Sequence, residues 1–146
     1  MPELNGVAPY FEVFDMISSV SFYRDQLGFT LLFASPEVDT NEGRFSHFVR
    51  LGRGGAEIML NTAYDSNERP SDRHEPRWQG TRHTRLYFDC DDVRALHEEF
   101  TARGVKADPP EMTGYGMLGF SMTDPDGYGL TFHQAVGRDG ADAAAV

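Results

Sequence analysis

Three side chains that can bind a metal ion are predicted to share one side of their strands. His83, His133 and Glu57 each fall at a position whose parity points away from the hydrophobic core. Two histidines and one carboxylate suit a metal ion that keeps open coordination positions. The three residues could equally be independent parts of a pocket wall or rim. We favour this second interpretation, because parity on separate strands is weak evidence that side chains converge.

Arg85 shares this predicted pocket side. It could anchor a carboxylate or an enolate of a ligand, or it could pair with Glu12, Glu57 or Asp89. We favour pairing, because a buried arginine without a partner is costly. Glu12, Glu57 and the acidity of the chain would in turn suit a cationic group on a ligand.

Other chemistries find no support in the sequence. It contains no Ser-His-Asp order and no phosphate-binding glycine loop. The sequence Asp124-Pro125-Asp126-Gly127 is typical of a type I turn. It is not a calcium-binding loop, because His133 would stand where a bidentate glutamate is needed.

Composition narrows the class of protein. The chain has 146 residues, enough for one domain or two small repeats, and a net charge of -10, which argues against a nucleic-acid partner. The single cysteine, Cys90, excludes an internal disulfide and fits a reducing compartment; its parity predicts a core residue rather than a nucleophile. No basic leader and no long apolar run is present. We therefore expect a soluble, cytoplasmic protein without membrane contacts.

Strands and two helices must position these residues. Apolar spacing predicts a helix that begins after Asp15 and ends at Gly28, and another that is capped by Asp91 or Asp92 and ends at Gly104. Alternating apolar residues predict strands at 7–14, 29–34, 45–51, 56–61, 83–90, 105–107, 115–123 and 128–134.

The two halves of the chain repeat each other. An offset of 77 places Tyr10 on Tyr87, and an offset of 72 places Leu60 on Phe132. We therefore predict an α+β fold of two strand–helix–three-strand modules (paired βαβββ) that form open barrels around a cleft. The predicted boundaries are 7–62 for the first module, 63–81 for a connecting loop, 82–136 for the second module and 137–146 for a disordered tail.

Four short motifs follow one another at characteristic separations between residues 7 and 134. They are Asp15 with Phe22-Tyr23-Arg24-Asp25-x-Leu27-Gly28-Phe29, then Cys90-Asp91-Asp92-Val93, Tyr115-Gly116-Met117 and Asp124-Pro125-Asp126-Gly127. With these motifs the chain resembles the vicinal oxygen chelate superfamily, also called the glyoxalase/bleomycin resistance/dioxygenase family. Fold does not fix function in such a superfamily.

The resemblance implies a test for metal binding. Metalloenzymes of this superfamily hold a divalent ion with His and Glu ligands from the first and last strand of each module. Counted from the motifs, these positions fall on Ala8, Met59, Arg85 and Thr131, and none of them is a usable ligand. The chain therefore looks more similar to the metal-free branch, which includes bleomycin resistance proteins that sequester their drug in dimer clefts.

We therefore expect a homodimer that binds or sequesters a small aromatic molecule in a cleft, with no metal and no cofactor. An alternative is a metal-dependent lyase or dioxygenase with a non-standard His/Glu site, and a third is a domain with no ligand of its own. Whether any reaction is catalysed stays open. The residues expected to line the ligand site are Tyr10, Glu12, Phe48, Glu57, Met59, Asn61, Trp78, His83, Arg85, Tyr87, Tyr115, Met117, Thr131 and His133.

Overall fold

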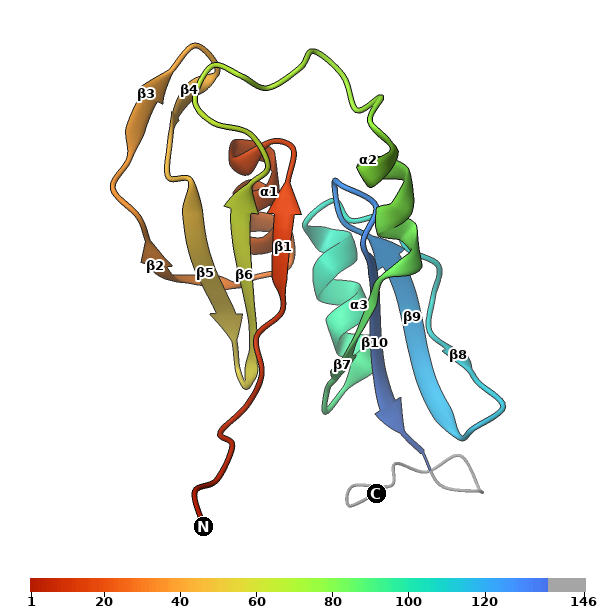
Figure 1. Cartoon of the computed structure of the whole chain (residues 1–146). Helices are drawn as coiled ribbons and strands as arrows, with labels where there is room; N and C mark the ends of the chain where they lie inside the picture. Colours follow the sequence, from red (N-terminus) through yellow and green to blue (C-terminus); the bar gives the residue numbers. More distant parts are fainter. Residues whose placement is uncertain (137–146) are drawn as a thin grey trace. The chain divides into compact units, whose positions relative to one another are not determined.

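The computed structural model describes residues 1–136 and divides the chain into two compact units. Unit 1 is Met1–His74 and unit 2 is Glu75–Val146 (Figure 1). The predicted tail, residues 137–146, lies outside the described residues. Each unit carries its own sheet and its own core, so the two are described separately.

Unit 1 is a four-stranded sheet with one long helical segment. The sheet has the order β1-β6-β5-β2, with β1 parallel to β6 and the other neighbours antiparallel. A separate hairpin joins β3 and β4. The elements are β1 (Tyr10–Val13), α1 (Met16–Ser21), the π-helical turn η1 (Phe22–Gln26), β2 (Thr30–Ala34), β3 (Val38–Thr40), β4 (Gly43–Phe45), β5 (Phe48–Arg53) and β6 (Ala56–Thr62).

Unit 2 repeats this topology. Its sheet has the order β7-β10-β9-β8, again with the first strand parallel to the last. The elements are α2 (Pro76–Gly80), the 3-10 turn η2 (Thr81–His83), β7 (Arg85–Asp89), α3 (Val93–Ala102), β8 (Glu111–Met112), β9 (Met117–Thr123) and β10 (Gly129–Ala135). The predicted α+β class is confirmed. Both sheets stay open, and within residues 1–136 neither closes into a barrel.

Strand register aligns the two units residue by residue. Tyr10 stands opposite Met59 in unit 1, and Tyr87 stands opposite Thr131 in unit 2. These pairs are related by the offsets of 77 and 72 that the sequence predicts. The internal repeat is therefore a repeat of hydrogen-bonded register as well as of pattern.

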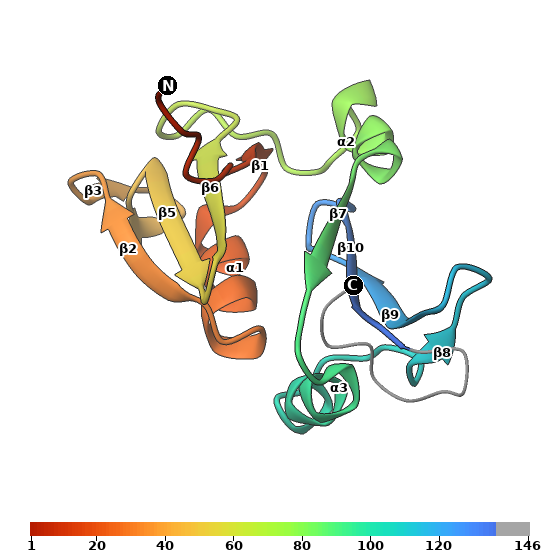
Figure 2. The same cartoon turned by 90° about the horizontal axis from the view of Figure 1, so that it is seen from below.

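One face of each sheet is covered by a helix. Figures 1 and 2 show α1 on one side of the unit 1 sheet and α3 on one side of the unit 2 sheet. Between helix and sheet lie the buried apolar side chains, and burying one such side chain contributes about 1.5–3 kcal/mol. They include Phe11, Val13, Tyr23, Leu51, Ile58 and Leu60 in unit 1, and Val93, Phe100, Leu118, Phe120, Leu130 and Phe132 in unit 2.

Both helices begin as the sequence predicts. Asp15 accepts a hydrogen bond from the Ser18 N–H at 3.1 Å, and Asp92 accepts one from the Ala95 N–H at 3.0 Å. The first helix ends differently from an ordinary α-helix, because it widens into η1, where the Leu27 N–H donates to the Phe22 carbonyl at 3.1 Å. This wider turn carries the fully buried Tyr23.

The strand predicted at 105–107 is wrong. The edge of the unit 2 sheet is instead β8, where Glu111 stands opposite Gly119. Asp108, Pro109 and Pro110 separate the two segments. Proline has no N–H to donate and biases the preceding residue away from regular pairing, so the chain joins the sheet only after the two prolines.

The segment predicted as a structureless connection, 63–81, contains α2. Pro76 stands at its start, where a fixed φ favours a helix, and Trp78 lies buried within it at 7% exposure. His83 belongs to η2 rather than to the following strand, which begins at Arg85. Among the described residues no helix is long and apolar enough to cross a membrane.

Candidate functional site

The unit 2 sheet carries a group of polar and aromatic side chains on the face opposite α3. Alternate residues of the strands supply them, while Leu130 and Phe132 between them are buried in the core. We call this group the polar face; it consists of Arg85, Tyr87 and Asp89 from β7, Ser121 from β9, and Thr131 and His133 from β10.

Arg85 is seated against the backbone of the neighbouring strand. Gly129 stands opposite it in the register, and a Cβ atom at Gly129 would lie 3.0 Å from the guanidinium carbon of Arg85. Arg85 Nη1 donates a hydrogen bond to Thr131 Oγ1 at 3.0 Å, and the Thr131 and Ser121 hydroxyl oxygens are 2.8 Å apart. Glycine and two hydroxyl groups therefore hold the guanidinium in place.

The structure gives Arg85 no acidic partner among the described residues of unit 2. Asp89, one of the expected partners, lies instead against His133, with its Oδ1 atom 2.9 Å from Nε2. Glu57, another, is engaged within unit 1 by Arg50, whose Nε lies 2.6 Å from its Oε1. The interpretation that we favoured from sequence was a structural ion pair of Arg85 with Glu12, Glu57 or Asp89. The contacts of Asp89 and Glu57 give it no support, and Glu12 belongs to unit 1.

Tyr87 is the large exposed ring of the polar face, with 65% of its surface accessible. Its ring lies 5.4 Å from that of His133, at an interplanar angle of 49°. His133 is fixed between Tyr87 and Asp89, and a Cβ atom at the neighbouring Gly119 would come within 2.9 Å of the His133 Cβ. The two rings thus form a fixed aromatic surface next to Arg85.

Unit 1 presents a different set of side chains on the corresponding face. Tyr10 is 52% exposed, and the Arg50–Glu57 ion pair lies beside Met59, whose sulfur is 3.8 Å from Arg50 Nη1. Three further predicted residues belong to this unit: Glu12 is exposed on β1, the Phe48 ring packs 6.0 Å from Phe33, and Asn61 donates to the Thr62 carbonyl.

The remaining predicted ligand contacts lie away from the polar face as defined. Trp78 is buried in α2, and its small exposed fraction leaves little surface for a ligand. Tyr115 is 93% exposed in the turn that precedes β9, and Met117 begins that strand. His83 lies in η2.

Two of the three residues of the possible metal site are in contact with charged side chains from outside this set. Glu57 pairs with Arg50 and His133 with Asp89, while His83 lies in a turn. Across the described part of the chain, no three His, Cys, Asp or Glu side chains are grouped so that they could hold a metal ion.

Cys90 is a half-buried thiol next to the polar face. Burial is the main cause that raises its pKa. A hydrogen bond from the backbone N–H of Asp92 acts against it, and the negative charges of Asp91, Asp92 and Asp89 each raise the pKa further. A thiol with a raised pKa stays protonated at neutral pH, which does not favour a nucleophile.

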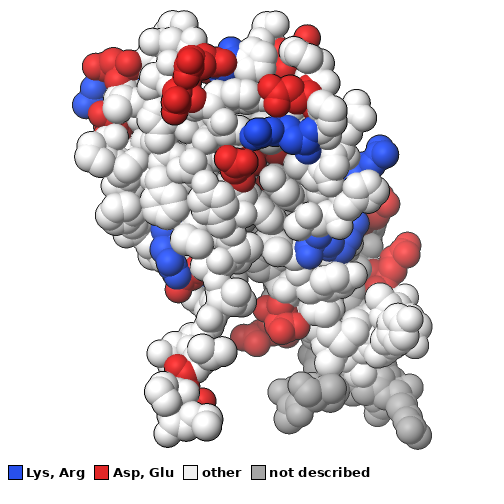
Figure 3. Space-filling model, viewed as in Figure 1, with Lys and Arg blue, Asp and Glu red and all other residues white. Residues whose placement is uncertain are grey.

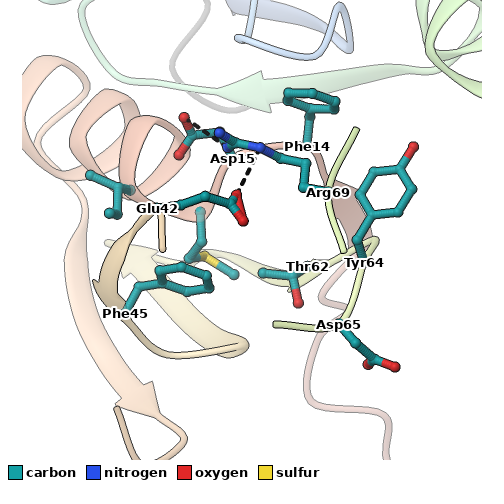
Figure 4. A pocket seen from close by; sticks show the side chains of 10 residues that line it. Phe14, Asp15, Glu42, Phe45, Thr62, Tyr64, Asp65 and Arg69 are labelled. Atoms are coloured by element: carbon teal, nitrogen blue, oxygen red, sulfur yellow. Dashed lines mark ion pairs between the residues drawn. The ribbon is translucent and has the colours of Figure 1, made fainter. Parts of the chain in front are cut away.

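Unit 1 contains a charged cluster that the sequence did not predict (Figure 4). Arg69 lies between two carboxylates, 3.2 Å from Asp15 Oδ2 and 2.8 Å from Glu42 Oε2, and its guanidinium carbon is 4.8 Å from the Phe14 ring centre. The cavity at this cluster has a volume of about 10 Å³, room for about one water molecule. Because this space is too small for a ligand, we interpret the Arg69 cluster as a structural contact. It holds residues 63–69 against the sheet and α1.

This cluster sets the ionisation of the helix cap. Burial alone would raise the pKa of Asp15, but hydrogen bonds from Ser18 and the charge and hydrogen bond of Arg69 outweigh it, so the pKa lies below its usual value. Arg69 lies 27 residues from Glu42 and 54 from Asp15 in the sequence, separations that no local sequence pattern reveals.

A shallow groove of about 550 Å³ runs beside α3 in unit 2. His97 lies at its wall, where Nε2 is 2.9 Å from the Ala107 carbonyl oxygen and the ring packs edge-on against Phe120. His97 is thus a packing residue. Figure 3 shows acidic side chains spread over the face in view instead of gathered in one patch.

The sequence matches the profile of the Glyoxalase/Bleomycin resistance protein/Dioxygenase superfamily over residues 11–132. A comparison with curated proteins finds no match.

Solved structures with similar folds include a bleomycin-binding protein from Streptomyces verticillus, crystallised with copper(II)-bleomycin. It has a TM-score of 0.65 and 23% identity, with 94% of this chain and 100% of that chain covered. The antibiotic-binding protein TnmS3 from a Streptomyces species has a TM-score of 0.61 and 24% identity, with 92% and 99% covered.

A glyoxalase/bleomycin resistance protein from the same Streptomyces species has a TM-score of 0.58 and 25% identity, with 88% and 99% covered. At these identities the structures support the fold, and the sequence profile supports the family. The profile spans most of the chain and coincides with the repeated strand–helix–three-strand units. This chain therefore belongs to the glyoxalase/bleomycin resistance protein/dioxygenase superfamily.

Proposed function

We propose that this protein binds or sequesters a small aromatic ligand on the polar face of unit 2, without a metal. The observation that carries the proposal is the exposed Tyr87 ring, held beside His133 and next to the seated Arg85. An aromatic ring on an open sheet face offers stacking area at low entropic cost, because only two torsions are fixed.

Two of the similar structures are named for antibiotic binding, one as a bleomycin-binding protein and one as an antibiotic-binding protein. Their names agree with a ligand-binding role for this chain. The alternative, a metal-dependent lyase or dioxygenase, would need a ligand set that the described side chains do not assemble. We therefore prefer ligand binding over metal-dependent catalysis.

We also propose that the protein works as a homodimer in the cytoplasm. The edge strand β2 exposes three consecutive apolar residues, Leu31, Leu32 and Phe33, and an exposed apolar edge is a template for pairing with another chain. Light scattering should give about twice the chain mass of 16.4 kDa. A single species of 16.4 kDa at micromolar concentration would remove this part of the proposal.

The binding proposal is tested with planar aromatic probes of one size, such as 2-naphthamide, followed by fluorescence and thermal shift. Tyr87→Ala should weaken binding at least tenfold, about 1.4 kcal/mol, because it removes the stacking surface. Met112→Ala is a matched control: it truncates an exposed apolar residue of the same sheet, on the edge strand β8. Equal affinity in the wild type and Tyr87→Ala would contradict the proposal.

A further inference from the structure

We propose that the aromatic ligand of the polar face is an acid, and that its carboxylate binds Arg85. This inference rests on the proposed function and specifies the ligand class for the same site. It goes against the cationic ligand that the acidity of the chain suggests. Three features of Arg85 support it. Arg85 has no acidic partner within unit 2, its side chain is held against Gly129 and Thr131 (the seat of Arg85), and one hydrogen-bonding edge of its guanidinium has no acceptor among the described residues.

The first feature is the contrast with other arginines. The chain has 23 acidic and 13 basic residues, and most arginines of the described part form an ion pair with a carboxylate. Examples are Arg44 with Asp39 at 2.9 Å and Arg69 with Glu42 at 2.8 Å. Arg85 has no such partner among the described residues of unit 2, and neither do Arg82 and Arg94. Arg85 differs from those two because it lies on the polar face, against Gly129 and Thr131. It is a fixed positive charge, because an arginine stays protonated in proteins.

The second feature is the seat itself. Gly129 lacks the Cβ atom that would approach the guanidinium carbon to 3.0 Å and Nη1 to 3.2 Å. Thr131 accepts the hydrogen bond from Nη1, and Ser121 supports the Thr131 hydroxyl at 2.8 Å. Part of the ordering cost of this long side chain is therefore met before a ligand arrives, which favours binding.

The third feature is the edge of the guanidinium that remains available. A guanidinium is a planar fork of five N–H groups, and the bond to Thr131 uses Nη1. The Nε–H and an Nη2–H point along another edge, and the described residues offer that edge no acceptor. Two parallel N–H groups match the two oxygens of a carboxylate.

The ring of such an acid would reach Tyr87. Arg85 and Tyr87 are two residues apart on β7 and share a face, which separates them by about 7 Å. A fused two-ring acid spans this distance. The carboxylate would bind Arg85 while the ring system lies against Tyr87 and His133, whose rings are 5.4 Å apart.

Local attraction must outweigh the repulsion between an anion and a protein of charge -10. At 0.15 M salt the Debye length is about 8 Å, so distant surface charges are largely screened while a contact of about 3 Å is not. The acidic residue of the polar face, Asp89, lies four residues from Arg85 along β7, a separation of about 13 Å that exceeds this Debye length. The contact with Arg85 therefore decides the sign of the preference.

The test uses three probes of the same shape: 2-naphthoate, 2-naphthamide and 2-naphthylmethylammonium, titrated at 0.15 M salt. The wild type should bind the naphthoate at least tenfold more tightly than the amide, about 1.4 kcal/mol, and the cation most weakly. Arg85→Gln should reduce the naphthoate-to-amide preference to within about twofold. Arg94→Gln is the matched control, because it removes the same charge from an exposed position on α3 and should keep the preference.

A second variant tests the seat without removing the charge. Gly129→Ala would place a methyl group against the guanidinium and displace it, so the naphthoate preference should fall several-fold although Arg85 is present. Circular dichroism and melting temperature would show that each variant is folded.

The outcomes separate the two proposals. An amide that binds as well as the naphthoate, or a preference kept in Arg85→Gln, overturns the acid inference and leaves aromatic binding standing. If none of the three probes binds the folded wild type, the proposed function fails and the inference fails with it.

Discussion

The two units share one topology, and one pair of equivalent positions shows how their exposed faces differ. Position 8 of unit 1 corresponds to position 85 of unit 2, and position 57 corresponds to position 129. Unit 1 has Ala8 and Glu57 there, whereas unit 2 has Arg85 and Gly129. In unit 1 the carboxylate is neutralised by Arg50 from β5 at 2.6 Å. In unit 2 the arginine rests on a glycine and a hydroxyl group.

This difference shows how a repeat can keep its fold and change its surface. The buried positions stay apolar in both units, because each unit must bury its own helix against its own sheet. The exposed positions between them are free to vary. At this pair of positions unit 1 has a carboxylate paired with Arg50, and unit 2 has an arginine without an acidic partner among the described residues of its own unit.

The largest effect should come from the shared core. Phe132 and Leu60 are equivalent positions, and Phe132 packs against Phe88 at 4.8 Å and Phe120 at 5.4 Å between ring centres. Phe132→Ala should cost about 3–5 kcal/mol and Leu60→Ala about 2–5 kcal/mol of unfolding free energy, measured by urea denaturation. A loss below about 1 kcal/mol in either unit would show that its core is not packed as described.

A smaller effect is expected at the two helix caps. Asp15 and Asp92 each accept one backbone N–H, so changing either to alanine should cost about 0.5–2 kcal/mol. Only Asp15 is also held by Arg69.

The pKa of Asp15 is lowered in the folded state, so its contribution is complete at neutral pH and is lost as pH falls through that lowered value. Arg69→Met should therefore weaken the acid dependence of unfolding in wild type but not in Asp15→Ala. Identical acid profiles of wild type and Arg69→Met would contradict this.

The smallest effect tests the comparison most specifically. Glu57→Gln would leave Arg50 without its carboxylate and make the unit 1 face more like that of unit 2. We expect a few-fold gain in naphthoate affinity at a second, weaker site, because an exposed arginine alone contributes about 1 kcal/mol or less. Calorimetry that shows an unchanged stoichiometry and affinity would mean that the unit 1 face lacks the other parts of the site.

Much of the fold could be predicted because its signals are local. Aspartate caps, glycine ends and alternating apolar residues are read from neighbouring positions, and the offsets of 77 and 72 then give the repeat. The strand predicted at 105–107 was wrong because an alternating pattern of only three residues carries too little information. Pro109 and Pro110 determine instead where the pairing of β8 with β9 begins. The π-helical turn η1 had no distinct local signal.

The site was harder to predict because it depends on contacts across strands. The seat of Arg85 needs Gly129 beside it, and the cluster of Arg69 needs Asp15 and Glu42, all distant in sequence. One signal for this contact was present in the sequence. If residue 8 is paired with residue 57 in unit 1, the offsets of 77 and 72 pair Arg85 with Gly129 in unit 2. The identity of Glu57 as a partner of Arg50 follows only from the register of β5 and β6.

The central claim is that the polar face of unit 2 is where an aromatic ligand binds. The most direct test is a titration of ¹⁵N-labelled protein with 2-naphthoate, followed by amide chemical shifts. The account predicts the largest shifts at Arg85, Tyr87, Thr131 and His133, with saturation at a single affinity. Shifts confined to unit 1 or to the groove beside α3, with these four amides unchanged, would contradict it.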